Sequence, residues 1–128
     1  MRWFVDTNLL VAVITEDDDR ADEALAALNE HETHTSVLNL MELRSVLSKK
    51  KQFDREHIER IETRIVDQAT ITFPDASDIV SANRFQRETY LYPMDALILA
   101  AADAANATLV SFDAELREHG AKPPREIL

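Results

Sequence analysis

The sequence predicts an α/β fold, a three-layer sandwich with a mostly parallel central sheet of about four or five strands flanked by helices. Short apolar segments that are typical of buried strands alternate with helical segments along the whole chain. Parallel strands need crossover connections, so helices are expected on both faces of the sheet. The 128 residues, of which 45% are hydrophobic and 30% charged, suit one packed domain over residues 1–128.

The first half of the chain is expected to contain two strands and four helices. The strands cover residues 2–5 and 33–35, which are short segments. The helices cover residues 8–14, 21–29 and 37–48 and a segment that begins at Asp54. Thr7 is expected to cap the first helix, and the acids at 17–19 to begin the second. The last two helices are expected to form an arm.

The second half continues the alternation of strands and helices. Strands over residues 69–73 and 108–111 flank two helices, which cover residues 75–89 and 93–105. A proline lies at or just before the start of each helix, where its fixed backbone angle suits the first turn. Residues 120–128, which include two consecutive prolines, are expected to be extended or irregular.

The composition excludes several classes of protein. The chain has no cysteine, which excludes disulfide scaffolds, thiolate zinc sites, iron–sulfur clusters and thiol nucleophiles. Any metal must therefore be held by oxygen or histidine ligands. The apolar run Leu9–Ile14 is far too short for a membrane span, and Asp6 interrupts what would be a secretory signal. We therefore expect a cytoplasmic protein that does not contact a membrane.

The charge is strongly acidic overall but uneven along the chain. A formal net charge of −10 argues against binding nucleic acid through the overall field, and it resembles the surface chemistry of halophilic proteins. Residues 44–64 contain seven basic and four acidic side chains, hence +3, and the rest of the chain carries −13. This segment can therefore present a local basic face. Lys49–Lys51 can equally serve only to close a helix at its C-terminal end.

Four acids are not fully accounted for by a solvated surface or a simple helix cap. Asp6 directly follows the first predicted strand, and Asp113 follows the last one. Glu42 lies on an apolar stripe of its helix, and Asp95 lies in the first turn of a strongly apolar helix. Taken singly, Asp95 and Asp113 could be ordinary helix-start acids. Because ligand crevices form at the carboxyl ends of parallel strands, we expect all four carboxylates to converge there.

Four converging carboxylates would repel one another strongly. Apart from Arg44, no Lys or Arg is adjacent to any of them, so one or two divalent cations are the expected remedy. A set of oxygen ligands without Cys or His suits Mg²⁺ or Mn²⁺. Such a site polarises a phosphoryl oxygen and activates a water for attack on a phosphodiester.

Four segments stand in a characteristic order and spacing: Phe4–Asn8, Ser36–Arg44, Pro93–Ala100 and Leu109–Asp113. Together they resemble the PIN-domain family of ribonucleases, and the size of the chain resembles that of the VapC-type toxins of toxin–antitoxin pairs. The resemblance implies a metal-dependent endoribonuclease that holds Mg²⁺ or Mn²⁺ around the scissile phosphate. The implied catalytic residues and metal ligands are Asp6, Glu42, Asp95 and Asp113. Asn8 and Ser111 are similar to family residues that orient the carboxylates or a water.

The same resemblance implies partners. The substrate would be RNA, with tRNA, rRNA and mRNA all left open. The residues that could contact it are Arg44, Lys49, Lys50 and Arg84. A homodimer and a cognate antitoxin are also implied, and Arg or Lys in the antitoxin tail would complement the acidic site.

Two other functions remain open from the sequence. A PIN-like module could bind RNA or protein without catalysis, because the presence of four acids does not establish turnover. A receiver-type signalling domain also has an acidic Mg²⁺ pocket. It would need a second acid beside Asp6 and a late lysine at the site, whereas the late Lys122 lies in the tail.

Two smaller features have ordinary structural interpretations. His31 and His34 are three residues apart, and a solvated turn is favoured over a zinc site. Tyr90 and Tyr92 precede the helix that carries Asp95. Aromatic packing at the junction of two helices is favoured over stacking on an RNA base.

Overall fold

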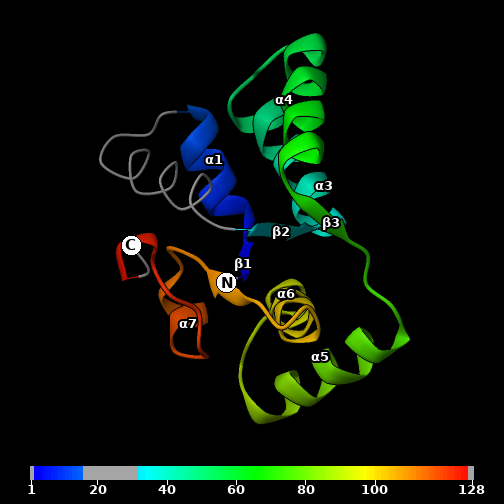
Figure 1. Ribbon diagram of the computed structural model, residues 1–128, viewed down its shortest axis with the longest axis vertical. Coiled ribbons are helices and arrows are strands. Elements are labelled where there is room, and N and C mark those ends of the chain that lie inside the picture. The colour runs from blue at the N-terminus through cyan, green and yellow to red at the C-terminus, as the bar shows by residue number, and fades with distance from the viewer. Residues whose placement is uncertain (1, 16–31, 127–128) are drawn as a thin grey trace.

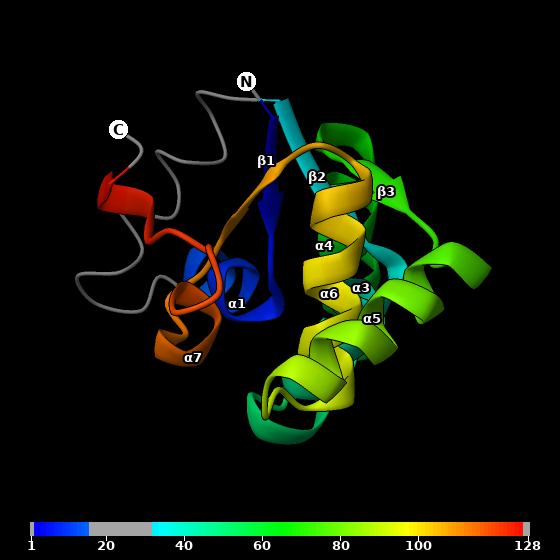
Figure 2. The same cartoon turned by 90° about the horizontal axis from the view of Figure 1, so that it is seen from below.

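The computed structural model describes residues 2–15 and 32–126. Its centre is a four-stranded sheet in the order β3-β2-β1-β4, and every pair of neighbouring strands is parallel (Figures 1 and 2). The strands are β1 (Arg2–Val5), β2 (Glu32–Ser36), β3 (Thr70–Thr72) and β4 (Thr108–Val110). This parallel sheet, flanked by helices, confirms the predicted α/β sandwich.

Helices cover both faces of the sheet (Figure 2). They are α1 (Thr7–Thr15), α3 (Val37–Ser45), α4 (Arg55–Gln68), α5 (Ala76–Glu88), α6 (Pro93–Ala104) and α7 (Ala114–Arg117). A π-helical turn, η1 (Val46–Lys50), continues α3, and together with α4 these elements form the predicted arm. The predicted helix over 21–29, with its expected start at 17–19, lies outside the described residues.

The C-terminal segment is more regular than the sequence predicts. Lys122 pairs with Val110 in a parallel bridge, with N–H···O distances of 3.0 Å from Ser111 to Lys122 and 2.9 Å from Lys122 to Leu109. A 3₁₀ turn, η2, follows over Pro124–Glu126. The bridge thus attaches this segment to the edge of the sheet beside β4.

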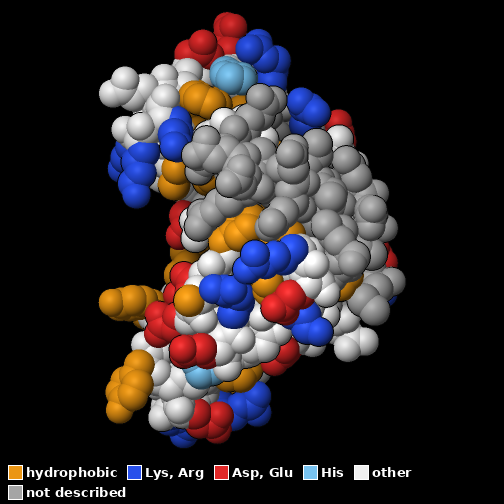
Figure 3. Space-filling view, turned by 90° about the vertical axis from the view of Figure 1, so that its left-hand side faces the viewer, with side chains coloured by type: hydrophobic (Ala, Val, Ile, Leu, Met, Phe, Trp, Pro, Cys, Tyr) orange, Lys and Arg blue, Asp and Glu red, His pale blue; other side chains and the backbone are white. Residues whose placement is uncertain are grey.

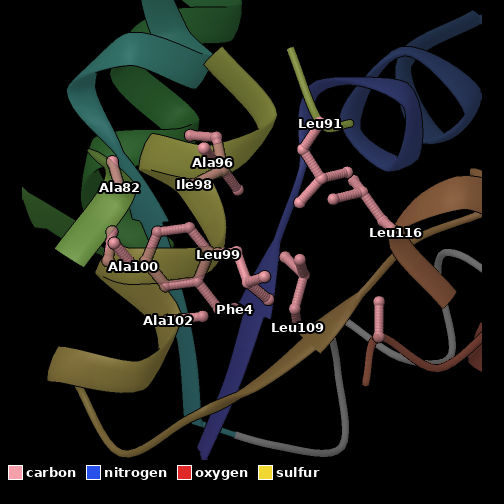
Figure 4. Packing of buried hydrophobic residues seen from close by; sticks show 12 residues of the cluster. Phe4, Ala82, Leu91, Ala96, Ile98, Leu99, Ala100, Ala102, Leu109 and Leu116 are labelled. Atoms are coloured by element: carbon pink, nitrogen blue, oxygen red, sulfur yellow. The ribbon is translucent and has the colours of Figure 1, made fainter. Parts of the chain in front are cut away.

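The core consists of two apolar clusters, one on each face of the sheet. Successive side chains of a strand point to opposite faces, so Phe4 belongs to one cluster and Val5 to the other. The first cluster joins Phe4 and Leu109 to α6 (Figure 4). The second joins Trp3, Val5 and Val110 to α1 and the arm. Both faces of β1 are therefore buried, which explains its apolar sequence.

Helix α6 lies directly on the sheet and carries one of the four predicted site acids. Its buried side chains are mostly alanines, and small side chains let a helix approach its neighbours closely. It packs against α5 on one side and against β4 on another. Within residues 2–15 and 32–126, no helix has the length and apolar character needed to span a bilayer.

Aspartates begin several of the helices. Asp54 accepts the N–H of His57 at 2.8 Å, and Asp75 caps α5, so these two helices begin where the sequence predicts. The prediction that Thr7 caps the first helix is wrong. Thr7 is the first residue of α1, and the carboxylate of Asp6 accepts the capping N–H from Leu9 at 3.0 Å.

Candidate active site

A small pocket opens at the carboxyl edge of the sheet, beyond the ends of β1 and β4. Its cavity volume is about 40 Å³, which holds a cation with a few waters but not a nucleotide. The lining residues are Asp6, Thr7, Asn8, Asn39, Glu42, Met94, Asp95, Ile98, Asp113 and Leu116. The structure therefore brings all four predicted carboxylates and Asn8 around one cavity. Among the described residues, no Lys or Arg side chain lines it.

Asp6 is the most enclosed of these carboxylates. Its Oδ1 accepts the N–H of Leu9, and its Oδ2 accepts the hydroxyl of Ser111. The pKa of Asp6 is raised from 3.8 to about 6, chiefly by burial and to a smaller extent by the negative charges of Asp113 and Asp95. The two hydrogen bonds lower the pKa, but they do not offset the loss of solvation. Asp6 thus holds its charge at neutral pH against an unfavourable environment.

Asp95 lies in the first turn of α6 and is partly buried. Its pKa is raised, chiefly by burial and then by the charges of Asp113, Glu115 and Glu42. Asp95 therefore interacts electrostatically with carboxylates from α3 and from the start of α7 across the pocket. Glu115 was not among the predicted site residues. It follows Asp113 by two positions in an exposed-looking acidic segment, so the sequence does not distinguish it from a solvated acid.

Asp113 both caps a helix and lines the pocket. Its Oδ1 accepts the N–H groups of Glu115 at 2.8 Å and Leu116 at 3.2 Å, which begins α7. Its own N–H donates to Ser111 Oγ at 3.0 Å. Because the same hydroxyl donates to Asp6, Ser111 connects two of the carboxylates and fixes their relative position.

Glu42 reaches the pocket from α3 and is exposed, so water hydrates its carboxylate despite the apolar residues on its stripe. One turn earlier, buried Asn39 was missed by the sequence prediction. Its Oδ1 accepts the N–H of Ser36 at 3.2 Å and the hydroxyl of Thr35 at 3.3 Å, and its Nδ2 donates to Thr7 at 3.1 Å. Asn39 therefore ties the end of β2 to the start of α1. The Ser-x-x-Asn spacing of a capping box was the available signal.

The predicted RNA-contacting residues all lie outside the pocket. Arg44 forms an ion pair with Glu62 at 2.7 Å, within the arm. Lys49 and Lys50 are exposed on η1, and Arg84 is exposed on α5. Figure 3 shows Asp and Glu side chains along a hollow in the outline of one face, with Lys and Arg side chains above it. The site is thus acidic at its centre and basic beyond its rim.

The lining has the chemistry of a site for a hard divalent cation. Its charged members are all carboxylates, and Asn and Thr supply further oxygen atoms. Within the part of the chain that the structure describes, no three Asp, Glu or His side chains already stand in a metal-holding arrangement. The donor set therefore fits Mg²⁺ or Mn²⁺ by its chemistry, without a preformed coordination shell.

Two of the smaller predictions are wrong. His34 lies buried in β2 rather than in a solvated turn, and its Nε2 is 3.2 Å from Glu32 Oε1. His31 lies outside the described residues. Tyr90 and Tyr92 do not pack at the helix junction but project into solvent, with 99% and 71% of their surface exposed.

Comparisons with known proteins agree with this architecture. The family model of the PIN domain matches residues 3–122. None of the curated proteins compared with the chain matches it in sequence.

Several solved structures share the fold at low sequence identity. The Mycobacterium tuberculosis VapC20, described as a sarcin–ricin loop cleaving toxin, is 19% identical with a TM-score of 0.77, over 93% of this chain and 95% of that one. A toxin–antitoxin complex from Klebsiella pneumoniae is 23% identical with a TM-score of 0.71, over 88% and 87%. VapBC2 from Rickettsia felis, bound to a promoter DNA fragment, is 21% identical with a TM-score of 0.73, over 94% and 93%. By its fold, and by a family match over nearly the whole chain, this protein belongs to the PIN-domain family.

Proposed function

We propose that the protein is a metal-dependent endoribonuclease that hydrolyses RNA phosphodiester bonds. The observation that carries the proposal is the convergence of four carboxylates on one pocket, those of Asp6, Glu42, Asp95 and Asp113. Among the described residues, no cationic side chain lines this pocket. The raised pKa values of Asp6 and Asp95 support it, because no cationic group in the described part of the chain compensates the charge of these carboxylates. A divalent cation is such a partner.

The four carboxylates would hold Mg²⁺ or Mn²⁺, and each side chain has a distinct contribution. When bound, the cation polarises a phosphoryl oxygen and lowers the pKa of a water that attacks phosphorus. Ser111 and the Leu9 N–H keep both oxygens of Asp6 in a fixed orientation. Asn8, exposed at the pocket, can orient the water or the phosphate through its amide. No covalent protein intermediate is required.

The size of the pocket decides how RNA binds. A cavity of about 40 Å³ admits a phosphate edge but not a nucleotide, so the RNA strand must lie across the opening. The strand would then run over the surfaces beside the pocket, where Lys49 and Lys50 on the arm and Arg84 on α5 can contact phosphates. Arg44 is less available, since it pairs with Glu62.

We further propose that the protein is the toxin of a VapBC-type pair, acting in the cytoplasm as a homodimer. The support is the likeness in fold to VapC20, described as a toxin, and to chains of a toxin–antitoxin complex and of VapBC2. An antitoxin segment containing Arg or Lys would complement the acidic pocket and block it. Copurification of the protein with the product of a neighbouring gene would test this part separately.

A cleavage assay with a matched pair of variants tests the nuclease. Purified protein is incubated with total cellular RNA in Mg²⁺, Mn²⁺ or EDTA, at low and at molar salt. Asp95→Asn removes a pocket carboxylate, and Asp103→Asn removes an exposed acid of the same helix. We expect discrete fragments that require metal, disappear with Asp95→Asn and persist with Asp103→Asn.

The opposite results would overturn the proposal. Cleavage that continues in EDTA, or that is equal in the two variants, would mean that the carboxylates are not the metal-binding catalytic groups. Metal binding measured by calorimetry, without cleavage of any RNA in any condition, would favour a non-catalytic binding module.

A further inference from the structure

Two tyrosines beside the pocket are exposed without a structural role. Tyr90 is 99% exposed and Tyr92 is 71% exposed, whereas Leu91 between them is 3% exposed. The three residues connect α5 to α6, and their side chains alternate between solvent and core. Leu91 enters the core, and both aromatic rings are turned toward solvent.

The backbone that carries the tyrosines is held in place. At the end of α5, the Thr89 N–H donates to Phe85 O at 2.9 Å, and the Leu91 N–H donates to Thr89 Oγ1 at 3.2 Å. At the start of α6, Tyr92 O accepts the Ala96 N–H at 3.0 Å. The rings are therefore presented from a fixed backbone, and binding to them costs little ordering of the chain.

The tyrosines lie at the rim of the carboxylate pocket. Tyr92 is the N-cap of α6, and Asp95, three residues later, lines the pocket. Tyr92 thus lies immediately before the first turn of α6, which contributes both Met94 and Asp95 to the pocket. Leu91 lies beside Leu116, another pocket residue, in the core (Figure 4). Only Leu91 separates Tyr90 from Tyr92, so the Cα atoms of the two tyrosines are at most about 7 Å apart.

A stacking contact would provide a place for the bases outside the pocket and a source of affinity that does not depend on positive charge. The pocket is too small for a base, so the bases on either side of the phosphate must bind elsewhere. The net charge of −10 weakens any affinity that depends on attraction of phosphates. Stacking on an aromatic ring needs no charge and tolerates any base, and Arg84 and Arg87, exposed in the last turns of α5, can add local phosphate contacts.

From this arrangement we infer that Tyr90 and Tyr92 form a stacking site for unpaired nucleobases next to the scissile phosphate. The inference rests on the proposed nuclease function and deepens it, because it names the two side chains that would hold unpaired bases beside the cleavage position. Bases in a duplex are stacked on their neighbours and cannot lie on these rings.

Binding of a fluorescent RNA tests the stacking site without cleavage. The probe is a single-stranded oligoribonucleotide of mixed sequence with one 2-aminopurine, whose fluorescence is quenched by stacking, and binding is measured in EDTA. We expect Tyr90→Ala and Tyr92→Ala each to weaken binding by about tenfold and to reduce the quenching. Tyr→Phe at either position should preserve both. Phe73→Ala is the matched control, since Phe73 is also 71% exposed but lies at the far end of α5.

The salt dependence of binding separates stacking from charge. Loss of a stacking contact lowers affinity by the same factor at low and high salt, whereas loss of a phosphate contact reduces the salt slope. Equal binding by the wild type and both alanine variants, together with intact metal-dependent cleavage, would overturn the stacking site and leave the nuclease standing. Equal losses in the Phe and Ala variants would also overturn it, because the hydroxyl would then be the contact. An absence of both RNA binding and cleavage would overturn the nuclease as well.

Discussion

Asp6 and Asp75 have the same local role and opposite electrostatics. Each aspartate comes just before a helix and accepts backbone N–H groups of its first turn, from Leu9 for Asp6 and from Ser77 and Asp78 for Asp75. Yet the pKa of Asp6 is raised to about 6, whereas hydrogen bonds with Ser77 and Asp78 lower the pKa of Asp75. The hydrogen bonds lower the pKa at both positions, and only at Asp6 does burial outweigh them.

The comparison shows that an aspartate at a helix N-cap can have a second role besides capping. At the start of α5 the Asp75 side chain is exposed to solvent, so the cap simply stabilises the helix. At the end of β1 the same motif holds a charge in a buried position beside Asp113 and Asp95. Such an arrangement is unfavourable for the metal-free protein, and it is therefore evidence for a ligand rather than for stability.

The largest expected effect is the loss of activity when Asp6 becomes Asn. We expect Asp6→Asn to lower metal-dependent RNA cleavage by more than about 100-fold, the upper range for residues that only support a metal ligand. Asp75→Asn should leave cleavage within about twofold of the wild type, as surface changes do. Initial rates at equal protein and metal concentrations measure both. Similar losses in the two variants would remove the functional distinction between the two caps.

The same substitution, Asp6→Asn, should lower cleavage but raise the thermal stability of the metal-free protein. A carboxyl group with a raised pKa binds its proton more tightly in the folded state, so its stability penalty develops as pH rises from about 4 to about 6 and is complete above that. A shift from 3.8 to about 6 corresponds to about 3 kcal/mol. In EDTA at pH 7, Asp6→Asn should therefore raise the melting temperature, and the gain should vanish near pH 4. Thermal unfolding across this pH range measures it, and a destabilised variant at pH 7 would contradict it.

An intermediate effect is expected at Ser111, which supports Asp6 without lining the pocket. Ser111→Ala removes the hydrogen bond that favours the charged carboxylate, so the pKa of Asp6 should rise further and its metal affinity fall. We expect a loss of about 10-fold to 100-fold in Mn²⁺ affinity by calorimetry. Ser111→Thr keeps the hydroxyl and should restore most of the affinity. Failure of threonine to do so would mean that Ser111 acts only through packing.

The smallest effect is expected at the exposed cap. Asp75→Ala removes the acceptor for the Ser77 and Asp78 N–H groups and should lower the free energy of unfolding by about 1 kcal/mol. Urea denaturation measures this change. An equal cost from Asp6→Ala at pH 7 in EDTA would show that the two caps do not differ as their environments indicate.

The parts of this structure that depend on local pattern were predictable from the sequence. Short apolar runs identify β1 and β4, and aspartates identify the starts of α4 and α5, at Asp54 and Asp75. Both features are determined by residues close together in the sequence. The convergence of the four candidate acids on one cavity was predictable for a related reason. Strand ends meet at one edge of a parallel sheet, so topology brings Asp6 and Asp113 together before any contact is known.

The parts that depend on tertiary contact were not predictable. The type of residue at Thr7 suggests a helix cap. In the folded protein Asn39 from α3 donates to the Thr7 hydroxyl, and Asp6 caps the helix instead. The burial of His34 and the exposure of Tyr90 follow from which neighbours cover them, and short segments carry no information about that. The charge of Glu115 raises the pKa of Asp95, and this proximity of α7 to the start of α6 is a tertiary feature that the sequence does not show.

The bridge between Val110 and Lys122 bears on the solubility of the folded chain. β4 is an edge strand, and an open edge invites intermolecular strand pairing and aggregation. Lys122 occupies hydrogen-bonding groups of Leu109 and Ser111 on that edge, immediately beside the site. Deletion of the residues from 121 onward should therefore expose a strand edge next to Asp113 and promote self-association. Expression tags are consequently better tolerated when a spacer separates them from this bridge.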